Sequence, residues 1–136
     1  MNGLMMHCNL NITSIMQHAM TVHADQEIVS LKSDGVSTHR YTYKAAFKRV
    51  AQFAHVLDQL GISFDAKVGT LAWNTHQHME LHYAIPCTGR IYHTINPKLQ
   101  PAHIKQIILD AHDEVLLIEP ECIPLLNLFY EEFQSF

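Results

Sequence analysis

Hydrophobic and polar residues follow one another in blocks along the chain, and the clearest blocks lie within residues 67–97. An apolar run at 68–72 leads into a polar corner and a helix-like segment, and a second apolar run at 91–95 ends in another polar corner. A buried strand, a crossover helix of about three turns and a parallel return strand match this order. The pattern therefore predicts a strand–helix–strand unit, whose helix Pro86 should end or kink at Ile85.

A second strong helical pattern occupies residues 43–60, where apolar side chains recur at every third or fourth position. Thr42 stands where an N-cap is expected, and Gly61 follows the last apolar residue as a signal for the helix end. We therefore expect a long amphipathic helix that buries one face.

Three weaker patterns of the same kind predict shorter helices. Residues 13–23 carry apolar side chains at helical spacing after two candidate caps, Asn11 and Thr13. Residues 101–112 begin with a proline, which suits a first helical turn, and residues 124–133 form a candidate last helix.

Short extended segments complete the pattern. Residues 27–31 and 38–42 flank an Asp34-Gly35 pair, and Asp-Gly between two such segments is typical of a β-hairpin. We expect this hairpin to flank the main sheet. The continuous apolar run at 115–118 predicts a third buried parallel strand.

Together these elements predict an α/β fold, a partial doubly wound parallel sheet with flanking helices and a small N-terminal β-hairpin. An open parallel sheet of this size leaves both edges bare, and it needs covering on both faces. We therefore expect residues 1–136 to form an incomplete N-terminal subdomain whose natural partner is more protein.

Composition narrows the function. The chain has 136 residues, of which 48% are hydrophobic and 16% charged, and its net charge is −4. One domain of this length can remove roughly two thirds of its unfolded surface from water, so a true core is possible. The nine basic residues are scattered and form no stripe that would neutralise a row of phosphates, so we expect no nucleic-acid partner.

Cysteine use and the N-terminal residues bear on location. The three cysteines lie far apart and match no paired spacing, which suits a reducing cytoplasm. Residues 1–10 lack the positive start and the continuous apolar segment of an export signal. No run approaches the roughly 18 apolar residues that a membrane span needs, so we expect a cytoplasmic protein without a span.

Several of the eleven histidines gather on the predicted crossover helix, where His76, His78 and His82 accompany Glu80. His78 and His82 stand at i, i+4, the spacing that lets two imidazoles reach one zinc ion. No third ligand is near in the sequence, and Cys87 has no second cysteine to complete a zinc deaminase signature. A solvated helix face is the better interpretation, and we predict no metal site.

Motifs for nucleotide binding and nucleophilic catalysis are absent from the sequence. The five glycines never cluster, so no strand–helix corner offers the loop with which backbone amides enclose a phosphate. No serine stands in a Gly-x-Ser-x-Gly elbow. We therefore predict no catalytic residues in this chain.

Ligands of open parallel sheets bind beyond the carboxyl ends of the strands. The polar side chains best placed there are Asn74 and His76 after the first strand and Asn96 after the second, which makes them the candidates for substrate binding. The alternative, favoured by the strong turn preference of asparagine, is that Asn74 and Asn96 only cap helices and shape turns.

Three segments carry a resemblance to a known family. They are Arg-Tyr-Thr-Tyr at 40–43, Val-Gly-Thr-Leu-Ala-Trp-Asn-Thr-His at 68–76 and Gly-Arg-Ile-Tyr-His-Thr-Ile-Asn-Pro at 89–97. In this order they resemble motifs in the N-terminal portion of the AMP-forming acyl-CoA synthetases, within the adenylate-forming superfamily. The Trp-Asn-Thr corner and the His-Thr-Ile-Asn-Pro strand end are most similar to the medium- and long-chain fatty-acid branch, and the resemblance spans residues 4–128.

Two positions depart from the family pattern. Ala45 stands where an acidic residue is common, which removes a capping contact. Arg90 replaces a small residue and brings a bulky charge to a helix–strand junction, where we expect it to loosen the packing.

The resemblance implies a fatty-acid–CoA ligase, which joins a carboxylate to ATP and then transfers the acyl group to coenzyme A. ATP, Mg²⁺ and CoA are implied for the full-length family, whose phosphate loop, magnesium motif and catalytic lysines lie beyond the matching part. We therefore expect this chain alone to bind none of them and to be inactive. The implied partner is the remainder of the ligase chain or a homodimer partner.

Two other functions stay open. The bare sheet edges favour a stand-alone interaction or dimerisation module derived from the same domain. The histidine cluster would serve a small zinc enzyme, which is the weakest of the three hypotheses.

Overall fold

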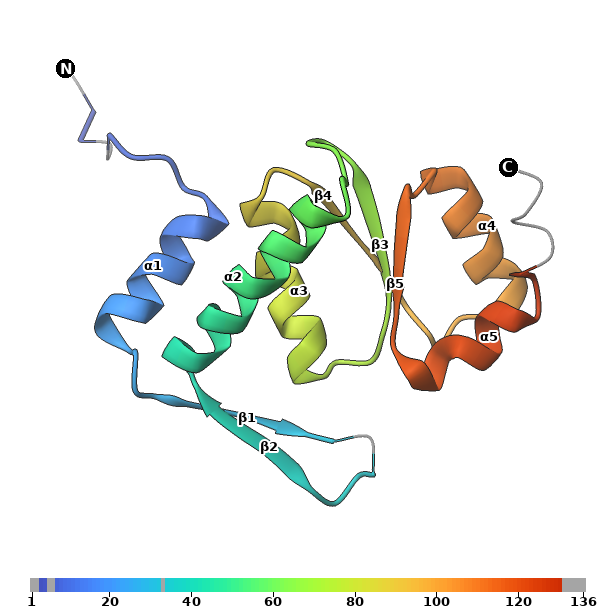
Figure 1. Ribbon diagram of the computed structural model, residues 1–136, viewed down its shortest axis with the longest axis horizontal. Coiled ribbons are helices and arrows are strands. Elements are labelled where there is room, and N and C mark those ends of the chain that lie inside the picture. The colour runs from blue at the N-terminus through green and yellow to red at the C-terminus, as the bar shows by residue number, and fades with distance from the viewer. Residues whose placement is uncertain (1–2, 5–6, 33, 131–136) are drawn as a thin grey trace.

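The computed structural model describes residues 3–4, 7–32 and 34–130. Its helices and strands follow one another as shown in Figure 1. They are α1 (Ile12–Val22), β1 (Glu27–Leu31), β2 (Thr38–Thr42), α2 (Tyr43–Gln59), β3 (Lys67–Leu71), α3 (His76–Cys87), β4 (Ile91–Ile95), α4 (Pro101–Ala111), β5 (Val115–Ile118), the 3₁₀ turn η1 (Pro120–Cys122) and α5 (Ile123–Asn127).

The main sheet has three parallel strands in the order β4-β3-β5. In its register Lys67 lies opposite Ile91, and Val68 lies opposite Val115. The predicted α/β class with a partial doubly wound parallel sheet is therefore confirmed. Within the described residues no helix is both long and apolar enough to cross a bilayer.

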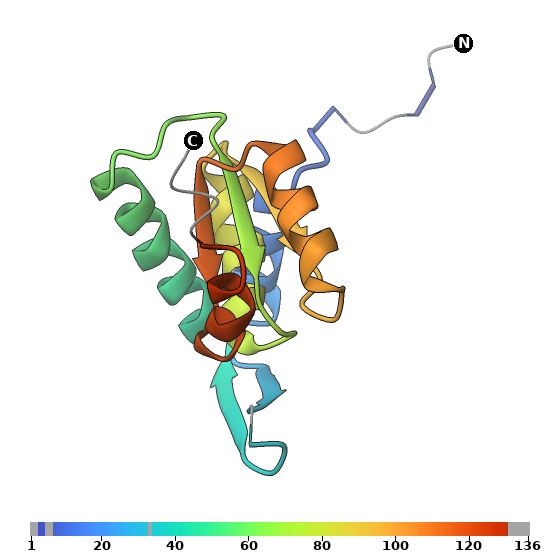
Figure 2. The same ribbon diagram turned by 90° about the vertical axis from the view of Figure 1, so that its right-hand side faces the viewer.

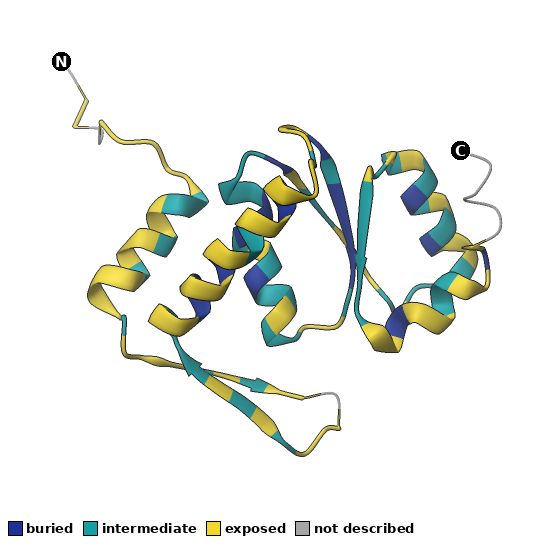
Figure 3. Cartoon of the chain, viewed as in Figure 1, coloured by how far each residue is buried: buried dark blue, intermediate teal, exposed yellow. Residues whose placement is uncertain are grey.

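Helices cover both faces of this sheet (Figure 2). On one face the buried core joins Leu57 of α2 and Ile85 of α3 to Val68 of β3. On the other face Ile104 and Ile108 of α4 pack with a set that includes Leu71, Ile95, Cys122 and Phe129. Figure 3 shows that burial concentrates on β3 and on the inward faces of the helices. A parallel strand enclosed on both sides is mainly apolar, and β3 buries Val68, Gly69 and Leu71 together with the hydrogen-bonded hydroxyl of Thr70.

The ends of α2 follow the predicted signals. The hydroxyl of Thr42 accepts a hydrogen bond from the amide of Ala45 at 3.2 Å. At the other end Gly61 has a φ of +70°, and the amides of Gly61 and Ile62 donate to the carbonyls of Asp58 and Leu57. This is a Schellman ending, which needs a residue free to adopt a left-handed conformation.

The cap of α1 is Asn11, whose side chain accepts from the amide of Ser14 at 2.9 Å. Of the two candidate caps, the structure therefore uses the first. The helix then runs from Ile12 to Val22 and packs its inner face on α2 and α3.

Two helix ends differ from the prediction. Helix α3 continues through Pro86 to Cys87, although we expected it to end or kink at Ile85. The hydroxyl of Thr88, which follows the proline in the chain, donates to the carbonyls of Ala84 and Ile85. Acceptors at the end of the helix are therefore hydrogen-bonded. Helix α5 ends at Asn127, earlier than the predicted helix over 124–133, of which residues 131–133 lie outside the described residues.

The hairpin forms at the predicted strands but joins only its own two strands within the described residues. In its turn the carboxylate of Asp34 accepts from the hydroxyl of Ser37 and from the amides of Val36 and Ser37. These hydrogen bonds, the hydroxyl first, lower the pKa of Asp34 to about 2. The hairpin projects beyond one end of the main sheet and does not extend it (Figure 1).

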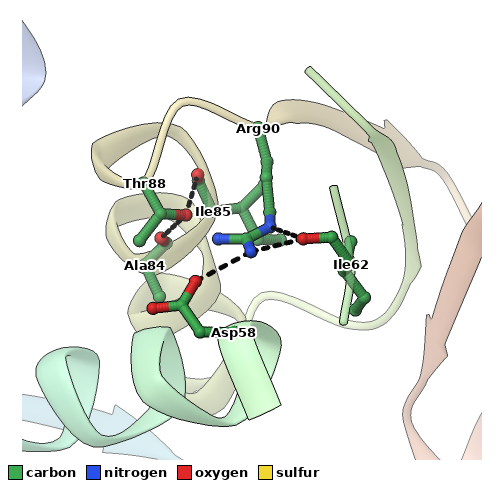
Figure 4. Close-up of polar contacts among 6 residues, drawn as sticks. All are labelled: Asp58, Ile62, Ala84, Ile85, Thr88 and Arg90. Atoms are coloured by element: carbon green, nitrogen blue, oxygen red, sulfur yellow. Dashed lines mark hydrogen bonds and ion pairs between the residues drawn. The ribbon is translucent and has the colours of Figure 1, made fainter. Parts of the chain in front are cut away.

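Arg90 tightens the junction that we expected it to loosen. Its side chain is only 5% exposed, and its guanidinium donates to the carbonyl of Ile62 at 2.6 and 3.2 Å and to the carboxylate of Asp58 at 2.8 Å (Figure 4). These acceptors lie at the end of α2 and in the loop that leads to β3. A buried charge is tolerated here because every contact is a charge-assisted hydrogen bond.

We predict that Arg90→Met lowers the free energy of unfolding by about 2 kcal/mol, because a buried carbonyl loses a charged donor. Urea unfolding followed by the fluorescence of Trp73 measures the change.

Arg40→Met is the matched control, because Arg40 pairs with Glu27 on the surface, where both side chains are more than half exposed. This variant should lose at most about 1 kcal/mol. Equal losses in the two variants would contradict a structural role of Arg90.

Candidate functional site

The carboxyl ends of β3 and β5 lie side by side, and the segments that follow them diverge to opposite faces of the sheet. In open parallel sheets ligands bind at such a point. A cavity of about 420 Å³ is found here. Its wall includes Leu31 and Lys32 from the hairpin, His76 and His78 from α3, and Leu117 and Glu119 from β5 and the residue after it.

His78 is held in one orientation by both ring nitrogens. Its Nδ1 lies 3.1 Å from the carbonyl of Trp73, and its Nε2 lies 3.1 Å from the hydroxyl of Thr70. Because a carbonyl only accepts, Nδ1 carries the proton and Nε2 accepts from the hydroxyl. Burial lowers the pKa of His78, which favours this uncharged form. The half-buried ring thus fixes the first turn of α3 to β3 rather than facing solvent.

His76 stands in the cavity wall and packs against the hairpin. Its ring stacks on that of His39, with ring centres 3.9 Å apart and planes 16° from parallel. Burial, and after it the neighbouring His39, lowers the pKa of His76 below its usual value of 6.5.

The two asparagines lie away from the cavity wall. Asn96 is exposed, and its side chain accepts from the amide of Lys98 at 2.9 Å, which is a turn contact. Asn74 is exposed in the corner after β3, and the N-cap of α3 is its neighbour Thr75. Of the three candidate residues, the structure places His76 alone in the cavity wall.

Glu119 ties the two strand ends together. Its carboxylate accepts from the amide of Trp73 at 2.7 Å, and its own amide donates to the carbonyl of Leu71 at 3.1 Å. The Nζ of Lys98 lies 5.9 Å from the centre of the Trp73 ring, within range of a cation–π contact. The link between Glu119 and Trp73 was not predicted from the sequence, because the two partners are far apart in the chain.

A second polar group lies behind the cavity, between α2 and α3. The carboxylate of Glu80 is 8% exposed and accepts from Nε of Arg49 at 2.7 Å. Burial and the nearby charge of Glu80 raise the pKa of Tyr41 above its usual value. Glu80 is therefore the buried partner of Arg49 in an ion pair, and it does not form a site together with His78.

The chemistry available to this arrangement is limited. Within the described residues no three His, Cys, Asp or Glu side chains are placed to hold a metal ion. Both nitrogens of His78 are engaged, and His82 packs edge-on against Tyr83 and Tyr92. The cavity can contact a ligand or another part of a protein, and it presents no paired nucleophile and base.

Comparison with known proteins identifies the chain's relatives. The family model described as AMP-binding enzyme matches residues 16–132. A 3-methylmercaptopropionyl-CoA ligase of Ruegeria lacuscaerulensis is 37% identical over 93% of this chain and 23% of its own length. A long-chain-fatty-acid–CoA ligase of Thermus thermophilus is 33% identical over 96% of this chain and 24% of its own length.

The fold agrees with these matches. The N-terminal domain of FACL13 from Mycobacterium tuberculosis superposes with a TM-score of 0.74 at 21% identity, over 88% of this chain and 29% of that one. The chain spans about a quarter of the length of the curated relatives that it matches. It belongs to the family of AMP-binding enzymes and corresponds to the N-terminal portion of the acyl-CoA synthetases within that family.

Proposed function

We propose that this chain is the N-terminal scaffold of a fatty-acid–CoA ligase. In that reaction a carboxylate attacks the α-phosphate of ATP and pyrophosphate leaves, after which the thiol of coenzyme A displaces AMP from the acyl-adenylate. The observation that carries the proposal is the 33% identity to a long-chain-fatty-acid–CoA ligase across 96% of this chain.

The corner after β3 does not fit a nucleotide phosphate. Its amide at Trp73 already donates to Glu119, and its amide at His78 donates to the hydroxyl of Thr75. The carboxylate of Glu119 would also repel an anion at this place. We therefore assign ATP, Mg²⁺ and CoA to other parts of the ligase and derive no chemical step from this chain alone.

Among the rim candidates we retain His76 for direct ligand contact, since it lines the cavity. Asn74 and Asn96 are better explained as corner and turn residues. The contribution of the rim to catalysis would be to position groups supplied by another part of the protein.

The expected partner is the remainder of a ligase chain. The outer edge of β5 supports this, because it pairs with no further strand among the described residues. Beside that edge lies a groove of about 590 Å³, lined mainly by Ile108, Leu109, Leu116, Ile118, Leu126 and Tyr130. An unpaired strand edge with an apolar flank is a favourable surface for further chain to cover.

A dimerisation module is the second candidate function, and the same groove favours it. The groove holds the partly covered Leu126 beside Tyr130, which is 50% exposed. A second copy could bury this surface if the domain acts by itself.

We predict that the purified 136-residue chain releases no pyrophosphate from ATP, Mg²⁺ and a fatty acid, because it contains no phosphate loop. A coupled pyrophosphate assay measures this, with the Thermus ligase as the positive control. Steady turnover by the chain alone would contradict the proposal.

We also predict that this chain can replace the matching segment of the Thermus ligase in a chimera and retain fatty-acid-dependent pyrophosphate release. The matched comparison is the same chimera carrying Arg90→Met, which should lose thermal stability before it loses turnover. A folded chimera without any adenylation would count against a ligase scaffold.

Sedimentation of the purified chain distinguishes the two proposed functions, the ligase scaffold and the dimerisation module. For a scaffold we expect no dimer of defined mass, and we expect Leu126→Lys to reduce nonspecific association because it charges the groove. Leu128→Lys, outside the groove wall, should have a smaller effect. A stable dimer that only Leu126→Lys dissociates would instead establish the dimerisation module.

A further inference from the structure

The hairpin meets α3 through rings rather than through a backbone ladder. His39 of β2 stacks on His76 of α3, and Tyr41 stands edge-on to both rings, with centres 4.7 and 5.9 Å away. The base of the hairpin is fixed separately, since the amides of Tyr43 and Lys44 donate to the carbonyls of Gln26 and Ala24. The hairpin thus contacts α3 through these rings, and hydrogen bonds join its base to α2.

The stack is suited to uncharged histidines. Nε2 of His39 is buried without a hydrogen-bond partner among the described residues. A second proton on that ring would place an N–H donor where no acceptor receives it, at a cost of the order of 1–3 kcal/mol. Two charged imidazoles face to face would also repel each other.

The other charges around His76 come from several elements. Glu80 on its own helix and Glu119 after β5 favour a charged ring, whereas Arg49 of α2 and His39 of β2 oppose it. Glu80 is neutralised by its short ion pair with Arg49. Burial is the largest influence, and it lowers the pKa of His76.

The hairpin also forms part of the cavity wall. Leu31 and Lys32, at the far end of β1, line the cavity together with His76 and Glu119. Movement of the hairpin away from α3 would remove that side of the wall. If the ring contact were released, the cavity at the strand ends would be open on the hairpin side.

We propose that His39 and His76 form a pH-dependent latch, which holds the hairpin against α3 while both rings are uncharged and releases it when they take up protons. The lowered pKa of His76 sets the sign: docking is complete above the usual histidine value of 6.5 and is lost as the pH falls below it. The latch is independent of which ligand or protein segment occupies the cavity.

Nuclear magnetic resonance of the 136-residue chain tests this between pH about 5 and about 8, the range in which histidine titrates. We expect the amide signals of β1 and β2 to shift on acidification, in step with the ring signals of His39 and His76. The fluorescence of Trp73 should stay constant, because the main sheet remains folded.

The double variant His39→Phe/His76→Phe keeps two rings in the stack, but neither can take up a proton, so the acid transition of the hairpin should be lost. His76→Gln removes the ring, and its hairpin should resemble the released form at every pH. His103→Phe on the exposed side of α4 is the control and should leave the transition unchanged.

The latch is overturned if the transition persists in the double variant His39→Phe/His76→Phe, or if the wild-type hairpin shows none while both rings titrate. Should the double variant fail to fold, as Trp73 fluorescence would reveal, the His76→Gln spectrum at neutral pH decides the question. Adenylation assays play no part in this test, so its outcome is separate from the ligase proposal.

Discussion

The central strand β3 is the constraint on which the rest of the structure depends. It pairs with a strand on each side, and its residues from Val68 to Leu71 are buried. At Gly69 an added Cβ would lie 2.7 Å from the carboxylate of Asp113 and 2.9 Å from the side chain of Leu116. The side chains of Asp113 and Leu116 therefore fill the space that a Cβ at residue 69 would need, and both would have to shift to admit a larger residue.

Polar contacts then connect the strands at both ends of the sheet. Near the amino ends, the carboxylate of Asp113 is 1% exposed and lies 2.8 Å from Nδ1 of His93, while Nζ of Lys67 donates to the carbonyl of Ala111 at 2.6 Å. Near the carboxyl ends, Glu119 joins β5 to the corner after β3. Apolar packing holds the faces, whereas these directional bonds fix the lengthwise positions of the strands, because each group is costly to bury unpaired.

Local patterns were sufficient to predict the elements, since each depends on neighbours in the chain. Thr42 and Gly61 mark the ends of α2 because capping is decided within a few residues. Two failures are local, since α3 continues through Pro86 and α5 ends at Asn127, and the others are long-range. Arg90 could be judged only with Asp58 and Ile62 in place, and the position of the hairpin depends on rings that the sequence does not link.

The candidate site shows the same division between local and long-range information. The topological rule predicts a site at the strand ends, where strand order alone makes the connecting segments diverge, and the structure has a cavity there. The roles of single residues could be assigned only from the fold. The ring of His78 is hydrogen-bonded to Thr70 and Trp73, and the side chain of Asn96 accepts from the amide of Lys98. What the chain still presents uncovered is the groove beside β5. Covering it with more protein would bury apolar surface, and each Å² buried would contribute about 25 cal/mol of stabilisation. Added chain near the strand ends would also exclude water from the rim, and electrostatic catalysis by any added group is stronger where water is excluded.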